Sequence, residues 1–212
     1  MLRPVKDGIV SPLAAAISSR VHPTVVTVGA FALGIGAFVC LLYEEMFLCA
    51  GLWLLGRLLD GLDGAVARRA GKQTDLGGYL DMLLDVVAYA LIPLGMAIAF
   101  PSHAVHVTVS VLLAVFYINI ASWMYLSALL EKHKAEGTDK GPTSVFMPAG
   151  IIEGTETIVF YTLFIAFPGY FVVLAYVMAA MTAATVIQRL IWAVAELPKR
   201  EQAAEKRNGR GS

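Results

Sequence analysis

The sequence has little charge and no excess of basic residues. Only 15% of its 212 residues are charged, whereas 58% are hydrophobic. A soluble domain usually has about 25% charged residues with which to cover its surface, so a soluble globular protein is excluded. Lys and Arg together number 16, as do Asp and Glu, and this balance indicates no nucleic-acid partner.

Cysteine is also scarce. The two cysteines, Cys40 and Cys49, lie in apolar surroundings and do not have the C-x-x-C spacing of a metal site. A disulfide scaffold and a zinc site are therefore both excluded as interpretations of the fold. What remains is a polytopic membrane protein with one domain.

Long apolar stretches are what the sequence has in abundance. A helix needs about 20 apolar residues to cross a hydrocarbon core of about 30 Å. The breaks between the stretches are charged or rich in Pro and Gly, as is typical of loops. Six stretches are long enough, roughly residues 25–43, 47–67, 79–100, 105–130, 147–167 and 170–195. The sequence therefore predicts an all-α integral membrane protein with six transmembrane helices.

Lys and Arg are confined to alternate loops. They occur near the amino terminus, after the second and fourth stretches and in the tail, but not in the three intervening loops. Because cytoplasmic loops carry the excess of Lys and Arg, both termini are predicted to be cytoplasmic, in a multi-pass protein of the cell membrane. The loop lysines also attract anionic lipid headgroups. Residues 1–22 are predicted to be an amphipathic juxtamembrane segment at the membrane interface, residues 23–197 the six-helix domain, and residues 198–212 a polar cytoplasmic tail.

Four aspartates interrupt the apolar pattern at the cytoplasmic ends of the second and third stretches. An ionised group inside a span costs about 2.5–3.5 kcal/mol on insertion scales, so its presence indicates a function. Residues three or four apart share a helix face. Asp60 and Asp63 share such a face on the second stretch. Asp81 and Asp85 share one on the third. A short loop makes the two helices antiparallel neighbours, so the acidic faces are expected to meet.

Four carboxylates in one place repel each other unless cations lie between them. Oxygen ligands favour the hard ions Mg²⁺ or Mn²⁺, and two such ions could share the four groups and orient a phosphoryl group. Gly64, Ala67 and Gly77 would leave space for a bulky ligand, and Arg68 offers a planar donor to it. In the alternative interpretation the aspartates are helix caps, as we expect for Asp75, and surface charges, and the glycines allow close helix packing.

The spacing of these residues resembles a known signature. The pattern D-x2-D-G-x2-A-R-x8-G-x3-D-x3-D is typical of the CDP-alcohol phosphotransferases, also called CDP-alcohol phosphatidyltransferases. It is complete here, at Asp60, Asp63, Gly64, Ala67, Arg68, Gly77, Asp81 and Asp85. The resemblance implies a membrane enzyme of six helices, usually a homodimer, with a polar cavity open to the cytoplasm.

The resemblance also implies roles for individual residues. Two divalent ions, Mg²⁺ or Mn²⁺, would be held by Asp60, Asp63, Asp81 and Asp85. Asp85 would also be the catalytic base that takes the proton of the acceptor hydroxyl. The resemblance implies a nucleotide contact from Thr24 less directly, because the family usually has Asn at that position. The cytidine nucleotide would be bound by Gly64, Ala67, Arg68, Thr74 and Gly77.

Glu153 and Glu156 are a further acidic pair, near the cytoplasmic start of the fifth stretch. They are a candidate acceptor site, or else they pair with Arg57 or Arg189. Family members that use a phosphorylated acceptor often have Glu-Arg pairs here. No arginine follows either glutamate in this chain, which argues against a phosphorylated acceptor.

Three functions follow as hypotheses. The leading one is a membrane transferase of phospholipid synthesis that moves the phosphatidyl group of CDP-diacylglycerol to a small alcohol acceptor and releases CMP. The alternative within the family transfers a phospho-alcohol from a small CDP-alcohol, such as CDP-choline, to diacylglycerol. A small cation-coupled transporter is the remote third, because transporters place their ion sites near the membrane midplane on broken helices, whereas these aspartates lie at one face.

Overall fold

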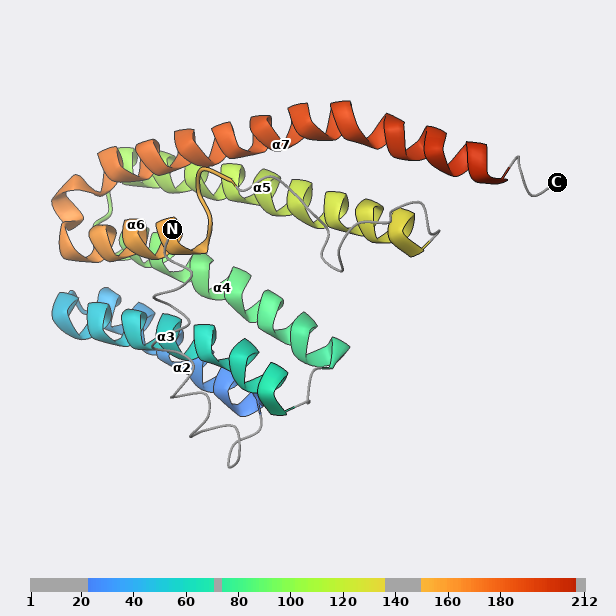
Figure 1. Ribbon diagram of the computed structural model, residues 1–212. Coiled ribbons are helices and arrows are strands. Elements are labelled where there is room, and N and C mark those ends of the chain that lie inside the picture. Colours follow the sequence, from blue (N-terminus) through green and yellow to red (C-terminus); the bar gives the residue numbers. More distant parts are fainter. Residues whose placement is uncertain (1–22, 71–73, 136–149, 209–212) are drawn as a thin grey trace. The chain divides into compact units, whose positions relative to one another are not determined.

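The structure is a computed structural model that describes residues 23–70, 74–135 and 150–208, with side chains described for residues 24–62, 74–133 and 150–202. Every element in these ranges is helical (Figure 1), which confirms the predicted all-α class. The elements are α2 (Pro23–Leu42), α3 (Met46–Ala70), α4 (Asp75–Ala99), α5 (His103–Ala135), α6 (Gly154–Ala166), the 3-10 turn η1 (Pro168–Tyr170) and α7 (Phe171–Asn208). The predicted amphipathic segment, residues 1–22, lies outside the described residues.

Several of the helices are suited to crossing a membrane. Within the described ranges, four are long and apolar enough: Thr24–Leu42, Asp75–Ala99, His103–His133 and Pro168–Gln202. α6 is apolar, but its 13 residues rise only about 20 Å, less than a hydrocarbon core of about 30 Å. α3 contains charged residues in its second half. The chain is thus an all-helical protein with several membrane-spanning helices, and six spans with both termini cytoplasmic remain a prediction.

Contacts divide the chain into two units. The first contains Met1–Val109 and Ile158–Val172, and the second contains Ser110–Thr157 and Val173–Ser212. α5, α6 and the start of α7 are therefore divided between the two units. Each unit is described by itself.

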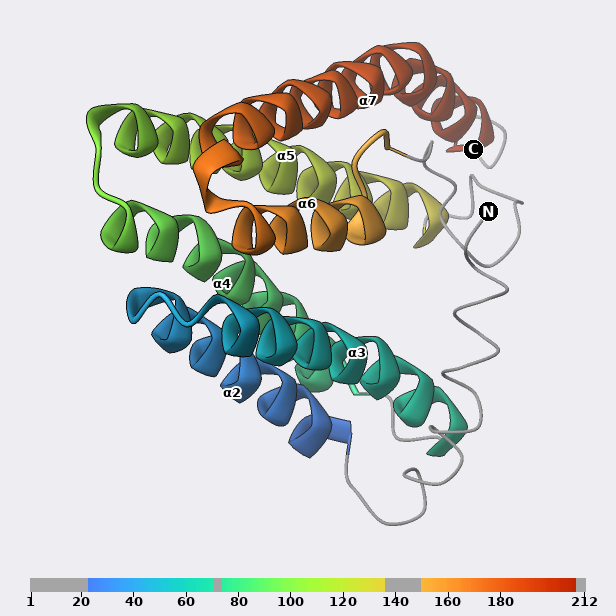
Figure 2. The ribbon, with the colours of Figure 1, turned by 90° about the vertical axis from the view of Figure 1, so that its left-hand side faces the viewer.

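In the first unit, α2 and α3 form a hairpin and α4 packs against α2 (Figure 2). Small residues permit the close packing of these helices. A Cβ added to Gly56 of α3 would lie 3.2 Å from the carbonyl oxygen of Ala30. One added to Gly95 of α4 would lie 2.7 Å from a methyl carbon of Leu41. Glycine at these two positions fits the close approach of α2, which a larger residue would push away or force to repack.

A proline inside α4 explains how α6 is attached to this unit. Pro93 has no N–H, so the carbonyl of Tyr89, four residues earlier, loses its usual helical donor. The hydroxyl of Tyr161 in α6 donates a 2.7 Å hydrogen bond to that carbonyl. The break in the α4 ladder is therefore repaired by a side chain from a helix distant in sequence.

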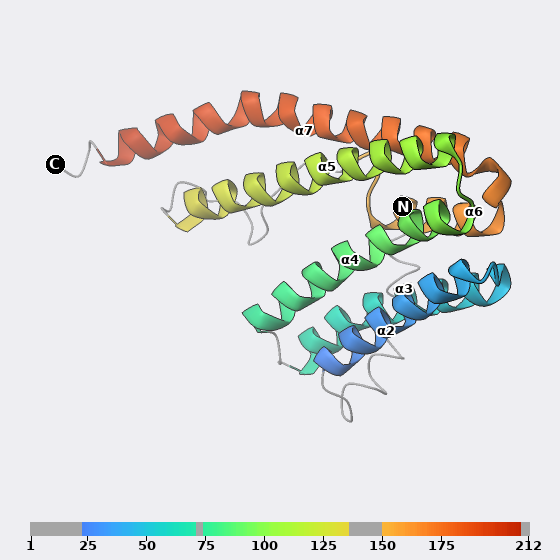
Figure 3. The same cartoon turned by 180° about the vertical axis from the view of Figure 1, so that it is seen from behind.

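In the second unit, α5 and α7 run side by side (Figure 3). They are joined by Arg189 of α7, whose Nη1 donates to the side-chain oxygen and to the carbonyl oxygen of Asn119, both at 3.1 Å. A partly buried charged group inside an apolar helix thus has hydrogen-bond acceptors supplied by the neighbouring helix.

Candidate active site

The backbone places the predicted acidic residues on two helices of the first unit. α3 is helical through Ala70, so Asp60 and Asp63 lie on one of its faces. α4 is helical from Asp75 onward, and its pair of aspartates also shares a face. The side chains of residues 63–70 lie outside those described. The roles of Asp63, Gly64, Ala67 and Arg68 therefore remain predictions.

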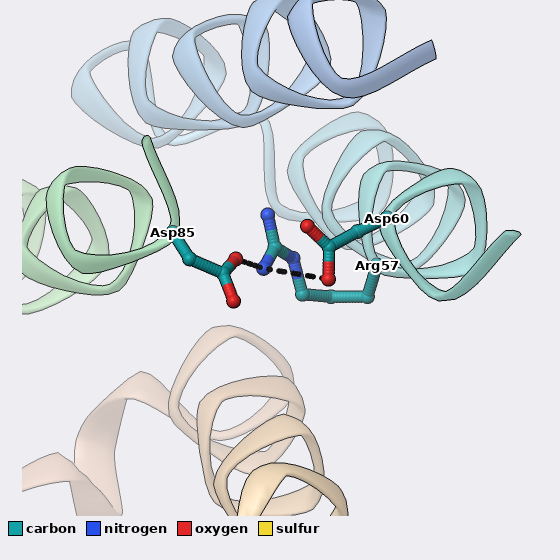
Figure 4. A network of polar contacts seen from close by, with 3 residues as sticks. All are labelled: Arg57, Asp60 and Asp85. Carbon is teal, nitrogen blue, oxygen red and sulfur yellow. Dashed lines mark hydrogen bonds and ion pairs between the residues drawn. The ribbon is translucent and has the colours of Figure 1, made fainter. Parts of the chain in front are cut away.

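Arg57 brings two of the four aspartates together (Figure 4). Its Nη1 donates a hydrogen bond to Oδ1 of Asp85 on α4 and lies 3.7 Å from Oδ2 of Asp60, which is three residues further along α3. The Arg57 side chain is 3% exposed, whereas those of Asp60 and Asp85 are 24% and 31% exposed. Two accessible carboxylates therefore share one buried cation.

Aromatic rings from α3 and α4 lie against Arg57, and a third ring from α6 packs on both of them. Its Cζ lies 5.1 Å from the ring centroid of Trp53 and 5.1 Å from that of Tyr89, within the range of cation–π attraction. Tyr161 stacks on Trp53 with the ring centroids 5.3 Å apart. We call Trp53, Tyr89 and Tyr161 the aromatic cage. The cage and the two carboxylates form the surroundings of the guanidinium.

The donor chemistry of the site fits a divalent ion. Carboxylate oxygens are the ligands that Mg²⁺ and Mn²⁺ prefer, and a cation already lies between Asp60 and Asp85. Asp81 lies one turn before Asp85 on the same face of α4. Among the side chains that the structure describes, no three Asp, Glu, His or Cys groups gather closely enough to hold one ion. Because Asp63 is not among them, the full ligand set remains a prediction.

Thr74 begins α4 as its N-cap. With φ −133° and ψ 150°, it accepts a 3.0 Å hydrogen bond from the amide of Gly77. The expectation that Asp75 caps this helix is therefore wrong, because Asp75 is already the first helical residue, where a negative charge favours the helix dipole. Among the described atoms, a Cβ on Gly77 would meet only the Thr74 hydroxyl, at 3.0 Å. Within that part of the chain, helix packing does not explain this glycine. Thr24, the other nucleotide candidate outside α3, is the second residue of α2.

Glu153 and Glu156 cap the start of α6. The amide of Glu153 donates to Oε2 of Glu156 at 3.1 Å, which is one half of a capping box. Oε1 of Glu153 accepts from the amide of Gly150 at 2.9 Å. Of the two arginines considered as partners for this pair, Arg57 bonds Asp85, and Arg189 interacts electrostatically with Glu153. The glutamates thus have a structural role in addition to any role in acceptor binding.

The segment before α6 is fixed to α7 by Thr185. The Thr185 hydroxyl accepts hydrogen bonds from the amides of Ile151 and Ile152, at 3.0 and 3.1 Å, and donates to the carbonyl of Met181. These bonds explain why the helix expected over residues 147–167 begins only at Gly154. The backbone amides that would start an earlier helix are engaged by Thr185.

The role of Arg57 was missed by sequence reasoning, which considered it only as a partner for the glutamates. The available signal was its position three residues before Asp60, on the acidic face of the same helix. The aromatic cage has no local signal, because its rings come from α3, α4 and α6.

Comparison with known proteins identifies the family. A family model described as CDP-alcohol phosphatidyltransferase matches residues 20–195. The inner membrane protein YnjF of Escherichia coli (strain K12) is 35% identical over 172 residues, which cover 81% of this chain and 82% of that protein. The chain belongs to the CDP-alcohol phosphatidyltransferase family, and it is a multi-pass membrane protein and a phosphotransferase.

Further relatives extend the comparison. The CDP-diacylglycerol–serine O-phosphatidyltransferase of Bacillus subtilis (strain 168) is 32% identical over 71 residues, 34% of this chain and 40% of that protein. The phosphatidylinositol phosphate synthase PgsA1 of Mycobacterium tuberculosis, solved with CDP-DAG bound, matches with a TM-score of 0.63 and 23% identity over 86% of this chain and 92% of PgsA1. Its structure with manganese and citrate matches with a TM-score of 0.61 and 24% identity over 85% and 87%. These structures share the fold of this chain.

Proposed function

We propose that this chain is a phosphatidyltransferase of phospholipid synthesis. It moves the phosphatidyl group of CDP-diacylglycerol to a small alcohol at the cytoplasmic face of the cell membrane and releases CMP. The observation that carries the proposal is that α3 and α4 bring Asp60 and Asp85, the first and last aspartates of the motif, to one buried cation. Carboxylates that cluster around positive charge can bind divalent ions, and such ions would in turn bind the diphosphate of the CDP-linked donor.

The direction of transfer is supported by the relatives. The Bacillus subtilis relative is named for CDP-diacylglycerol as its donor, and PgsA1 has been solved with CDP-DAG bound. Both favour CDP-diacylglycerol over a small CDP-alcohol as the donor of this chain. The transporter hypothesis is not supported, because the family consists of phosphotransferases.

Two divalent ions, Mg²⁺ or Mn²⁺, are assigned to the four aspartates. When bound, such ions would neutralise the diphosphate and stabilise charge on the leaving CMP. The assignment is supported by the carboxylate chemistry of the described residues and by the manganese in one PgsA1 structure. The ligands assigned are Asp60, Asp63, Asp81 and Asp85.

Asp85 is assigned as the base. Its carboxylate takes the proton of the acceptor hydroxyl as that oxygen attacks the phosphorus next to the lipid, and CMP leaves with the electron pair of the broken P–O bond. Two observations at the start of α4 support nucleotide binding on the helix that carries this residue. The Thr74 hydroxyl, which accepts from Gly77, still has a proton to donate to a ligand, and no described helix packs on Gly77. The remaining nucleotide contacts are assigned to Gly64, Ala67 and Arg68, with Thr24.

Acceptor recognition is assigned to Glu153 and Glu156. The Glu153 carboxylate accepts a hydrogen bond from the Gly150 amide and the Glu156 carboxylate accepts one from the Glu153 amide, so both are held in fixed positions. A carboxylate in a fixed position can accept a hydrogen bond from the hydroxyl group of the alcohol and orient it. Since no arginine follows either residue, a non-phosphorylated alcohol is the preferred acceptor.

A transfer assay tests the proposal. The purified chain, reconstituted in lipid nanodiscs with Mn²⁺, is given CDP-diacylglycerol and serine, glycerol, inositol, glycerol phosphate or inositol phosphate in turn. CMP is measured and the lipid product is identified by mass spectrometry, with CDP-choline and diacylglycerol as the reverse pair. We expect CMP and a phosphatidyl product from CDP-diacylglycerol, with a non-phosphorylated alcohol ranking first. Product from the reverse pair alone would exchange donor and acceptor, and no CMP from any combination would contradict the proposal.

A further inference from the structure

Arg57 lies where the proposed site needs positive charge. Its Nη1 bonds Asp85 and lies 3.7 Å from Asp60 (Figure 4), and both carboxylates are assigned to divalent ions. A carboxylate oxygen that accepts a hydrogen bond from a guanidinium has that lone pair engaged. A second cation at short range is also repelled by the first. A divalent ion that binds Asp60 and Asp85 therefore has to compete with Arg57.

The aromatic cage determines where the guanidinium of Arg57 lies once a divalent ion has displaced it from Asp85. The side chain is only 3% exposed, and its Nε has no hydrogen-bond partner among the described residues. Trp53 and Tyr89, each 5.1 Å from Cζ, attract the cation whether or not a carboxylate is present. Tyr161 is tied to the carbonyl of Tyr89 and holds the rings in place. The guanidinium can therefore release Asp85 and remain in the cage.

We propose that Arg57 is a positioning residue that holds Asp60 and Asp85 together in the metal-free protein and gives up its bond to Asp85 when a divalent ion binds. It thereby lowers the affinity of the site for that ion. This inference rests on the proposed function, which assigns the two aspartates as metal ligands. Its benefit is that the carboxylates are never left in the membrane without a counter-charge, which would be costly.

Titration of the reconstituted full chain with Mn²⁺ alone tests the inference, with the free ion measured by electron paramagnetic resonance. One charge-assisted hydrogen bond corresponds to a factor of roughly ten to a hundred in affinity. Because Asp85 is partly exposed, we expect Arg57→Gln to bind Mn²⁺ roughly tenfold more tightly than the parent. Arg57→Lys keeps the charge and should bind like the parent. The matched control is Arg200→Gln, which removes an arginine paired with Glu196 at 3.2 Å on α7 and should leave the affinity unchanged.

The sign of the change separates this role from a structural one. Damage to the fold weakens metal binding, so tighter binding by Arg57→Gln has no structural explanation. Unchanged or weaker binding would overturn the inference and leave the proposed function standing. Absence of Mn²⁺ binding by the parent chain would overturn the metal site of the proposed function, and the inference with it.

A measurement on the parent chain covers the case in which Arg57→Gln does not fold. Binding of Mg²⁺ changes the hydrogen bonding of a cation 5.1 Å from the Trp53 ring, so the fluorescence of Trp53 should change with the same midpoint as ion binding. The variant Trp53→Phe identifies this signal by its loss. Mg²⁺ binding that leaves the Trp53 emission unaltered would overturn the inference.

Discussion

At the scale of a single residue, Asp85 has two roles. It accepts a hydrogen bond from Arg57, and in the proposed mechanism it takes a proton from the acceptor. The first requires only an oxygen that can accept a hydrogen bond, whereas the second requires a basic carboxylate. An amide in its place would retain the shape and the ability to accept a hydrogen bond from Arg57, so the two roles can be separated by one substitution.

We therefore expect Asp85→Asn to lower CMP formation by at least about a hundredfold, since general base catalysis contributes about 10²–10⁴-fold. Binding of the nucleotide in the presence of metal should largely survive, because three aspartates remain. Both are measured on the purified variant, by CMP release and by equilibrium binding of a CDP-alcohol. Asp75→Asn, at an exposed carboxylate of the same helix, should retain turnover. Turnover near the parent rate in Asp85→Asn would remove this residue from the base role.

Arg57 shows which features of the site can be predicted from the sequence and which cannot. The aspartates could be predicted because their spacing is local and their charge is anomalous in an apolar helix. Arg57 and Asp85 are separated by 28 residues, and nothing in the order of the residues says which carboxylate an arginine will meet. The partner of a long side chain is decided by the packing of two helices, which the sequence does not specify locally.

At the scale of elements, the most informative contact is the one between α4 and α6. Pro93 leaves the Tyr89 carbonyl without its helical donor, and the Tyr161 hydroxyl donates to it instead. The same tyrosine stacks on Trp53, so one side chain both repairs a helix and supports the cage around Arg57.

Tyr161→Phe should destabilise the protein by about 1–3 kcal/mol, because a buried carbonyl is left without a donor. Pro93→Ala restores an N–H to α4, so in that background the same substitution should cost much less. The free energy of unfolding in mixed micelles, measured for the two single variants and the double variant, gives the coupling. The control is Tyr170→Phe at a tyrosine that is 68% exposed. Equal losses in both backgrounds would show that the hydrogen bond to Tyr89 does not stabilise the fold.

The start of α6 allows acceptor binding to be tested apart from helix capping. Glutamine can replace glutamate in a capping box, so Glu156→Gln should keep the bond from the Glu153 amide and leave stability unchanged. If Glu156 recognises the acceptor, the lost charge should raise the KM for the alcohol more than that for the donor and change the ranking among alcohols. Glu156→Ala should in addition lose about 1 kcal/mol of stability. If the ranking is the same in Glu156→Gln, Glu156 is a cap alone.

Helix positions followed from the sequence better than helix ends did. The apolar stretches are long, and their length alone predicts where the helices lie. Ends depend on single hydrogen bonds: Thr74 rather than Asp75 caps α4 because its hydroxyl reaches the Gly77 amide. Likewise α6 begins late because Thr185, more than thirty residues away, engages the amides of Ile151 and Ile152. The second case has no local signal at all.

At the scale of the whole molecule, the chain is an apolar helical protein with few charged residues. The family model matches residues 20–195, which include the described helices almost completely. In the first unit, the carboxylates of Asp60 and Asp85 gather at Arg57. The central claim is that this gathering serves divalent-ion-dependent transfer from a CDP-linked donor.

The most direct test is CMP release from CDP-diacylglycerol by the purified chain at a fixed alcohol concentration, in EDTA and after addition of Mg²⁺, Mn²⁺ or Ca²⁺. We predict no release in EDTA and full recovery with Mg²⁺ or Mn²⁺, because the diphosphate and the carboxylates both need charge compensation. Recovery with Ca²⁺ should be poor, since its longer bonds and higher coordination number would misplace the reacting oxygens. Release in EDTA at the rate seen with Mg²⁺ would contradict the account.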